Sequence, residues 1–164
     1  MDNIKQTSGE YFRSLINVFF GLIIGQVIFG LLSFFLVSTK RFSSEGADLS
    51  SVFIYVVPIF VLAGFILSSL IFKNRLKAID RKSNLMIKLD AYRAALILRY
   101  ALLEGPSMFA IVVYLVTGGI IFILLAALIV FYFVTIRPNK ENVIKDLDLN
   151  PNEEQILNDP NTKI

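Results

Sequence analysis

The sequence predicts an all-α integral membrane protein: a four-helix bundle with both termini cytoplasmic, a cytoplasmic amphipathic extension of the third helix, and a short helical tail. Of its 164 residues, 55% are hydrophobic, and the mean hydropathy is +0.68. Soluble domains usually contain about 45–50% apolar residues. The apolar residues fall into blocks of about 20, the length that an α-helix needs to cross a bilayer. Most Lys and Arg residues lie in the segment between the second and third blocks and in the two ends of the chain.

The predicted transmembrane domain covers residues 1–136 and contains four spans. They are expected at about 15–37, 52–72, 98–117 and 120–136. The last two are separated by Gly118-Gly119, which predicts a tight turn with no charge on it. The first block is far longer than the 7–15 apolar residues of a signal peptide, so we expect it to remain as an anchor.

The distribution of basic residues gives the orientation. The first connecting loop holds only Lys40 and Arg41, and the Gly118-Gly119 turn holds no basic residue. The segment between the second and third spans instead carries Lys73, Arg75, Lys77, Arg81, Lys82, Lys88 and Arg93. By the positive-inside rule, this segment and both termini are cytoplasmic. We therefore expect a multi-pass protein of the cell (inner) membrane, with both termini cytoplasmic.

Residues 73–97 form the predicted amphipathic extension. Apolar residues recur there at a spacing of three to four positions, at Leu76, Ile79, Met86, Leu89 and Tyr92, apart from one gap around Ser83. This spacing predicts an amphipathic helix that is continuous with the third span. Its basic face either lies at the lipid headgroups, which attract Lys and Arg, or docks an acidic partner such as the chain's own tail.

The tail, residues 137–164, is expected to pack beneath the bundle. Val143, Ile144 and Leu147 fall on one side of a short helix. A second helix should start with Asn150 as its cap, Pro151 at the first helical position and Glu153 at the third. We expect the chain after Asp159 to be disordered.

Small and polar residues inside the spans predict helix contacts, because small residues let helix backbones approach and amides bridge helices. At 100° per residue, the first span carries two such stripes, and the second span adds a shorter one. The sequence therefore predicts that the first span contacts neighbours on two sides, within one chain or in a homo-oligomer. The stripes are Asn17, Gly21 and Gly25; Gln26, Gly30 and Ser33; and Gly64 with Ser68.

The third span contains one acidic residue, Glu104, followed directly by Gly105 and Pro106. It lies six residues beyond the expected membrane entry, about 9 Å deep at 1.5 Å per residue. A charge at that depth is costly, and Pro106 leaves the carbonyl of Leu102 without its helical donor. Tyr100, one turn earlier, is expected to hydrogen-bond the carboxyl, and the candidates across the interface are Asn17 and Gln26. These five residues (Glu104, Tyr100, Asn17, Gln26 and Pro106) form the candidate intramembrane polar site.

Two resemblances follow from these motifs. Residues 73–117, with the stretch "ALLEGPSMFAIVVYLV", resemble the carboxylate-bearing helix of rotor-ring proteolipids of rotary ATPases. The resemblance implies that Glu104 binds and releases a proton or a sodium ion. The whole chain also resembles uncharacterised four-span bacterial membrane proteins, through Tyr92–Ile97, Leu102–Pro106 and Arg137–Glu141. That similarity implies no function.

Three classes of function remain open: a non-catalytic accessory or scaffold protein, a proton- or cation-translocating protein that uses Glu104, and a small oligomeric transporter or channel. An enzyme is not expected, because a lone carboxylate without a nucleophile–base pair supports no reaction mechanism. The chain has no Cys and no His, so we expect no metal site and no cofactor. The expected partners are the lipid bilayer and a protein or second copy, but not nucleic acid, which would require a large solvated basic face.

Overall fold

Helices make up the regular secondary structure of residues 6–39 and 50–164, the parts of the chain that the computed structural model describes. Within these residues there is no strand, only an isolated antiparallel bridge between Thr7 and Lys163. The all-helical prediction is therefore confirmed. The helices are α1 (Ser8–Ser38), α2 (Ser50–Lys77), α3 (Leu85–Thr117), α4 (Ile120–Thr135), α5 (Lys140–Leu147) and α6 (Pro151–Asn158).

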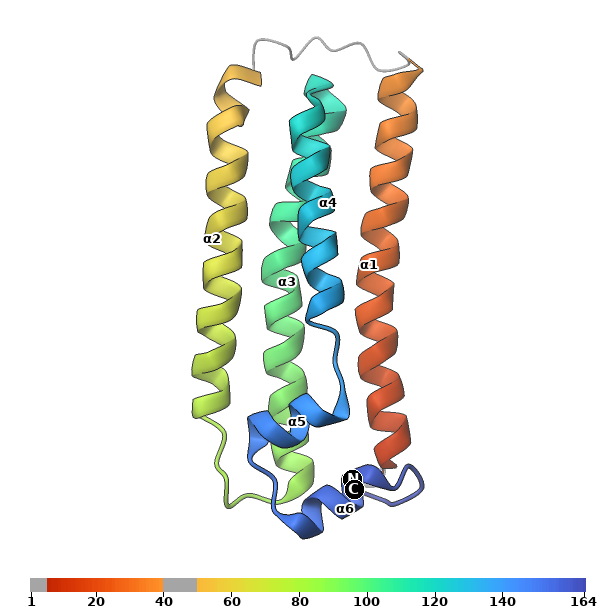
Figure 1. The fold of residues 1–164 in the computed structure, drawn as a ribbon, viewed down its shortest axis with the longest axis vertical. Coiled ribbons are helices and arrows are strands. Elements are labelled where there is room, and N and C mark those ends of the chain that lie inside the picture. The colour runs from red at the N-terminus through yellow and green to blue at the C-terminus, as the bar shows by residue number, and fades with distance from the viewer. Residues whose placement is uncertain (1–5, 40–49) are drawn as a thin grey trace, which may run out of the picture.

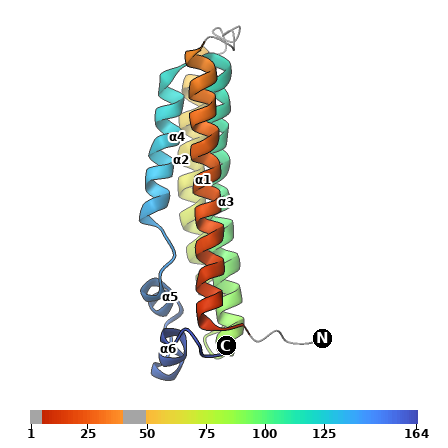
Figure 2. The same cartoon turned by 90° about the vertical axis from the view of Figure 1, so that its right-hand side faces the viewer.

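The first four helices run side by side along the long axis, and α5 and α6 lie together at one end (Figure 1). Helix α3 packs against α1, α2 and α4. Figure 2 shows α5 below the end of α4 and beside the lower parts of α1 and α3, and α6 near the start of α1. The tail helices therefore cover one end of the fold.

Three helices, α1, α2 and α3, are long and apolar enough to cross a membrane. Helix α4 is the most apolar of the helices but has only 16 residues, about 24 Å at 1.5 Å per residue. It makes an angle of 76° with α5, so α5 does not extend it in a straight line. A fourth membrane crossing would therefore be made either by α4 alone or by α4 and α5 together as a bent pair.

The long helices present apolar side chains outward and enclose polar ones. Phe131 of α4 is 73% exposed and Leu31 of α1 is 64% exposed, whereas Gln26 and Ser68 are almost fully buried. Contiguous apolar surface of this kind marks a membrane-facing or interaction surface. The buried cores between these helices contain large apolar side chains together with small and polar ones, and other large apolar residues lie on the outside.

The predicted continuous helix over residues 73–97 is wrong in its middle. Helix α2 continues to Lys77, a turn follows, and α3 begins at Leu85. The turn is held by Asp80, whose carboxylate accepts from Lys82 N at 2.9 Å, and by Asn84, whose side chain caps α3 by accepting from Ile87 N at 3.2 Å. Polar side chains that bond the local backbone outweigh the apolar periodicity here.

The third helix ends where the sequence predicts. Gly118 follows Thr117 with φ at 70°, the left-handed conformation that suits glycine at a helix C-terminus. Its amide donates to the carbonyl of Tyr114 at 2.8 Å. The chain then reverses into α4 within two residues.

The tail ends in an ordered segment, contrary to the expected disorder after Asp159. The amides of Ser8 and Gly9 donate to the carbonyls of Thr162 and Pro160, both at 3.0 Å. The hydroxyl of Ser8 donates to the carbonyl of Leu157 at 2.6 Å. Amides in the first turn of a helix have no partner within that helix. The tail is ordered because it supplies acceptors to the start of α1.

The two tail helices form as predicted and share a core with α1 and α3. Asn150 and Glu153 make a reciprocal capping box at the start of α6. Val143, Leu147 and Leu157 are fully buried. They belong to one apolar cluster that also contains residues of α1 and α3, among them Tyr11, Leu15, Leu89 and Tyr92.

A buried ion pair fastens the tail to α3. Lys88 Nζ lies 2.7 Å from Glu153 Oε1, and the two side chains are 4% and 13% exposed. Arg81 Nη1 also donates to the carbonyl of Asp146 at 2.9 Å. The tail therefore meets the 73–97 region, as one of the two sequence interpretations proposed, although most of the contact is apolar.

Candidate functional site

Helices α2 and α3 approach each other closely at Gly64 and Pro106. A Cβ atom placed on Gly64 would lie 2.5 Å from Pro106 Cγ and 2.8 Å from the carbonyl oxygen of Leu102. Proline has no N–H to donate to that carbonyl, four residues earlier. The proline notch of α3 is therefore filled by the backbone of α2, and only a residue without a side chain fits.

Glu104 lies on a different side of α3 from Pro106. Two residues of helix rotate the side chain by about 200°, away from the contact with α2. Glu104 is partly buried, and Ala101 and Gly105 beside it are exposed. A Cβ on Gly105 would have no atom within 4 Å. Within residues 6–39 and 50–164, no hydrogen bond or ion pair reaches the carboxyl of Glu104.

The structure does not bring the predicted partners to Glu104. The hydroxyl of Tyr100 donates instead to the carbonyl of Ile136 at 3.1 Å. Asn17 is exposed on α1. Gln26 is 1% exposed, but neither polar atom of its amide has a partner in the described chain. In the described residues the predicted pairing is not formed: Tyr100 bonds Ile136, Asn17 faces outward, and the buried amide of Gln26 has no partner.

The two predicted stripes of α1 have different outcomes. Gln26 and Ser33 are buried, and a Cβ on Gly30 would touch Ile123 and Ile111, so this stripe packs inside the fold. Asn17, Gly21 and Gly25 are exposed. A Cβ on Gly21 or Gly25 would meet nothing within 4 Å. The prediction that this second face contacts a neighbour within the chain is wrong.

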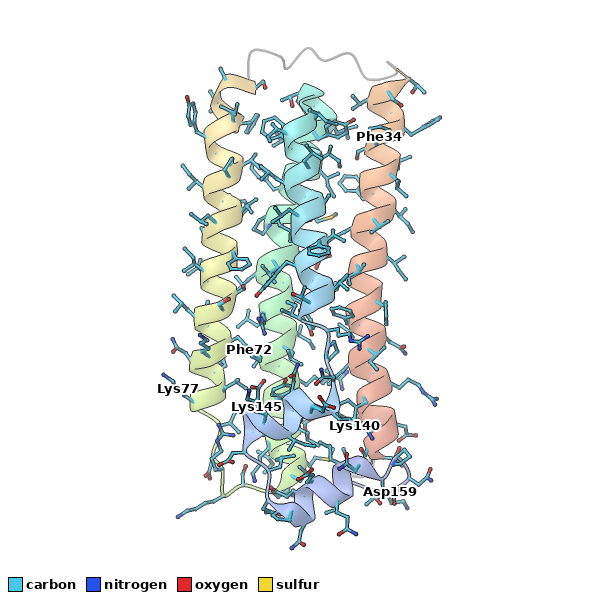
Figure 3. The ribbon with its side chains drawn as sticks, in the orientation of Figure 1. Phe34, Phe72, Lys77, Lys140, Lys145 and Asp159 are labelled. Atoms are coloured by element: carbon cyan, nitrogen blue, oxygen red, sulfur yellow. The ribbon has the colours of Figure 1, made fainter. Side chains whose placement is uncertain are left out.

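Arg99 forms a junction of three helices that sequence reasoning did not assign. Its guanidinium carbon lies 4.7 Å from the centre of the Phe72 ring of α2. Its Nη2 donates to the hydroxyl of Tyr132 of α4 at 3.2 Å. Figure 3 shows the labelled Phe72 on α2 near its lower end. The available signal was that all three residues fall near the cytoplasmic ends of the predicted spans, where Tyr and Arg are common anchors.

Two tyrosines at the tail end of the fold act as buried donors. The hydroxyl of Tyr11 donates to the carbonyl of Leu89 at 2.7 Å, and that of Tyr92 to Asp146 Oδ2 at 3.1 Å. Burial raises the pKa of both hydroxyls above the usual range for tyrosine. Both groups are therefore neutral at physiological pH and link α1, α3 and α5.

The chemistry available in the described residues is that of isolated polar groups. They contain no cluster of three or more His, Cys, Asp or Glu side chains that could hold a metal ion. Glu104 is the one carboxyl within the expected spans, and it can exchange a proton or accept hydrogen bonds from outside the chain. Comparison of the chain with protein-family models, curated proteins and solved structures gave no match.

Proposed function

We propose that the chain is a four-span protein of the bacterial inner membrane with cytoplasmic termini, and that it acts as a non-catalytic accessory subunit or scaffold. In this topology α4 is the fourth crossing, and the tail caps the cytoplasmic end. The exposed apolar side chains of α1, α2 and α4 support the bilayer as their surroundings.

The alignment of the helix ends supports one common membrane boundary. The ring of Phe19 on α1 lies 5.5 Å from the ring of Tyr100 on α3 and 6.4 Å from that of Phe133 on α4. Arg99 of α3 reaches Phe72 of α2. These residues stand at or near the cytoplasmic ends of the four expected spans. Their contacts therefore support a common level for the cytoplasmic membrane boundary across the four helices.

The accessory role rests on the unpartnered carboxyl of Glu104 beside an open helix face. An ionisable group within a span is costly unless it is paired or hydrogen-bonded. Pro106 is already covered by α2, but nothing in the described chain satisfies Glu104. A transmembrane helix of another protein that carries a hydrogen-bond donor would complete this group.

Partner capture with two variants at Glu104 tests the proposal. The tagged protein is purified in mild detergent and its complexes are weighed by native mass spectrometry. Glu104→Gln keeps a hydrogen-bonding side chain and should retain the partner, whereas Glu104→Leu should lose it. Phe131→Leu, on the exposed face of α4, is the control and should retain it. Equal recovery of the partner with Glu104→Leu would contradict the role of this residue.

The same free carboxyl also supports a second candidate, a proton or cation carrier similar to the rotor-ring proteolipids. A carrier requires a carboxyl that is not held in a permanent ion pair, and Glu104 meets that condition in the described residues. Such a protein would form a homo-oligomeric ring rather than a complex with a different protein.

Dicyclohexylcarbodiimide separates the two candidates, because it reacts with protonated carboxyls in apolar surroundings. A carrier should be labelled at Glu104, and labelling should fall as pH rises or as sodium is added. Glu104→Gln should then abolish transport by the reconstituted protein. An unreactive Glu104, together with a Gln variant that retains its partner, would remove the carrier.

A further inference from the structure

A hollow of about 300 Å³ lies between the first turns of α1 and the connection from α4 to α5. Its α1 side is apolar, and two of the residues there are open to the outside: Phe20 is 52% exposed and Ile16 is 38% exposed. The opposite side carries two cations, Arg137 and Lys140. The complete lining is Phe12, Ile16, Phe19, Phe20, Arg137, Pro138, Asn139 and Lys140.

The hollow lies at the cytoplasmic membrane boundary of the proposed topology, so this inference rests on the proposed function. Phe19, in its wall, contacts Tyr100, and Tyr100 donates to the carbonyl of Ile136 next to Arg137. The apolar side of the hollow therefore faces the lipid chains, and its basic side lies at the level of the headgroups.

The fold holds one of the two cations in place. Lys140 Nζ lies 5.6 Å from the centre of the Phe12 ring and donates to the carbonyl of Asn158 at 3.3 Å. In Figure 3, Lys140 lies at the α1 end of α5, whereas Lys145 lies at the far end. Arg137 is exposed at the mouth of the hollow.

Asp159, an acidic residue that interacts with Lys140, is already engaged in hydrogen bonds. Its carboxylate accepts from the hydroxyl of Thr162 at 2.6 Å and from the amide of Asn161 at 3.0 Å. Glu141 follows Lys140 and is exposed. Glu141 does not line the hollow, whose charged lining residues are both basic.

We propose that this hollow binds an anionic phospholipid of the cytoplasmic leaflet. Its phosphate receives hydrogen bonds from Arg137 and Lys140, and one acyl chain lies along Ile16 and Phe20. Guanidinium and ammonium groups form strong charge-assisted bonds to phosphate. A free anion would leave the apolar wall uncovered, and a zwitterionic lipid would bring its own cation against two others.

The chain has no Trp, so a single introduced Trp can report the lipid that it touches. Phe20→Trp places the reporter in the hollow, and Phe131→Trp places a control on the exposed face of α4, 73% exposed. The full chain is reconstituted in phosphatidylcholine vesicles that contain increasing fractions of phosphatidylglycerol brominated on its acyl chains. The reporter at position 20 should be quenched at a lower brominated fraction than the control.

The basic residues should set this preference. Arg137→Gln and Lys140→Gln, each in the Phe20→Trp chain, should weaken it roughly fivefold, as expected for the loss of one cation at an anionic surface. Lys145→Gln removes the same charge from the other end of α5 and should leave the preference unchanged. Ile16→Trp, at a second exposed position of the wall, repeats the measurement if Phe20→Trp disturbs the fold.

Three results would overturn the proposal: equal quenching at positions 20 and 131, an unchanged preference in both Gln variants, or displacement of the lipid by inorganic phosphate alone. The last result would indicate a site for free anions. If brominated lipid fails to quench even the control at position 131, the chain is not inserted and the proposed function fails as well. Failure of the lipid site alone leaves quenching at position 131 intact.

Discussion

Replacement of Gly64 with alanine would test the closest packing in the fold. The added methyl group would lie 2.5 Å from Pro106 Cγ and 2.8 Å from the Leu102 carbonyl oxygen, and neither belongs to a flexible side chain. We expect Gly64→Ala to lower the free energy of unfolding by about 1–3 kcal/mol, as overpacking usually does. Gly21→Ala, which meets nothing within 4 Å, should be neutral. Unfolding in mixed micelles measures both, and equal losses would contradict the predicted clash.

The ion pair between Lys88 and Glu153 gives a second prediction at the residue scale. Lys88→Met leaves the Glu153 carboxylate, 13% exposed, without its cation. Removing one partner of a buried pair costs about 3–5 kcal/mol. Hydrogen exchange of the α6 amides should therefore speed up strongly. Adding Glu153→Gln, which keeps an acceptor for the Asn150 amide, should restore much of the protection. No recovery in the double variant would show that the pair itself is not what holds the tail.

At the scale of elements, the sequence best predicts the helix ends that are fixed by capping residues close by in the chain. Gly118 ends α3, and Asn150 with Glu153 starts α6, because each end depends on residues within one turn. The break over residues 78–84 falls at the one gap in the apolar spacing, around Ser83, which the predicted helix spanned. Asn84 caps α3, and its position just ahead of a helical pattern was the usable signal.

The C-terminal turn should respond to acid. Hydrogen bonds from the Thr162 hydroxyl and the Asn161 amide lower the pKa of Asp159 below its usual value. A lowered pKa in the folded state contributes stability above the unfolded pKa, near 3.8, and loses it as pH falls through the folded value. Amide exchange at residues 161–164 should therefore rise as pH falls below about 4, once intrinsic rates are corrected. Thr162→Val should reduce this acid response, and an unchanged response would contradict the assigned cause.

At the scale of the whole molecule, topology can be read directly because the chain has no Cys. Single cysteines at positions 80 and 155 should react with a membrane-impermeant maleimide only after the inner face is opened. Cysteines at position 45, outside the described residues, and at position 118 should react in intact spheroplasts. Ser38→Cys, at the end of α1 near position 45, is a second outward control. A cytoplasmic position 118 would break the four-span proposal.

The candidate site was less predictable than the fold for a physical reason. The sequence gives the depth of each polar group along its helix, but a pairing between helices also depends on the rotation of each helix about its axis. Tyr100 and Asn17 stand near the depth of Glu104, yet Tyr100 turns to Ile136 and Asn17 turns outward. The contact between Gly64 and Pro106 needed the same information. The stripes of Gln26, Gly30 and Ser33 and of Gly64 and Ser68 pack inside the fold as predicted, whereas that of Asn17, Gly21 and Gly25 is exposed.

The hydrogen bonds between the tail and the start of α1 also restrict how many times the chain between them can cross a membrane. Ser8 and Leu157 are hydrogen-bonded across 149 positions of sequence, and a hydrogen bond cannot form through a bilayer. The chain between them must therefore cross the membrane an even number of times. If α1, α2 and α3 each cross once, the chain makes three crossings, which is an odd number. A crossing by α4 makes the number even. A chain in which α4 failed to insert would leave its tail on the opposite side from the first turn of α1, and these bonds could not form.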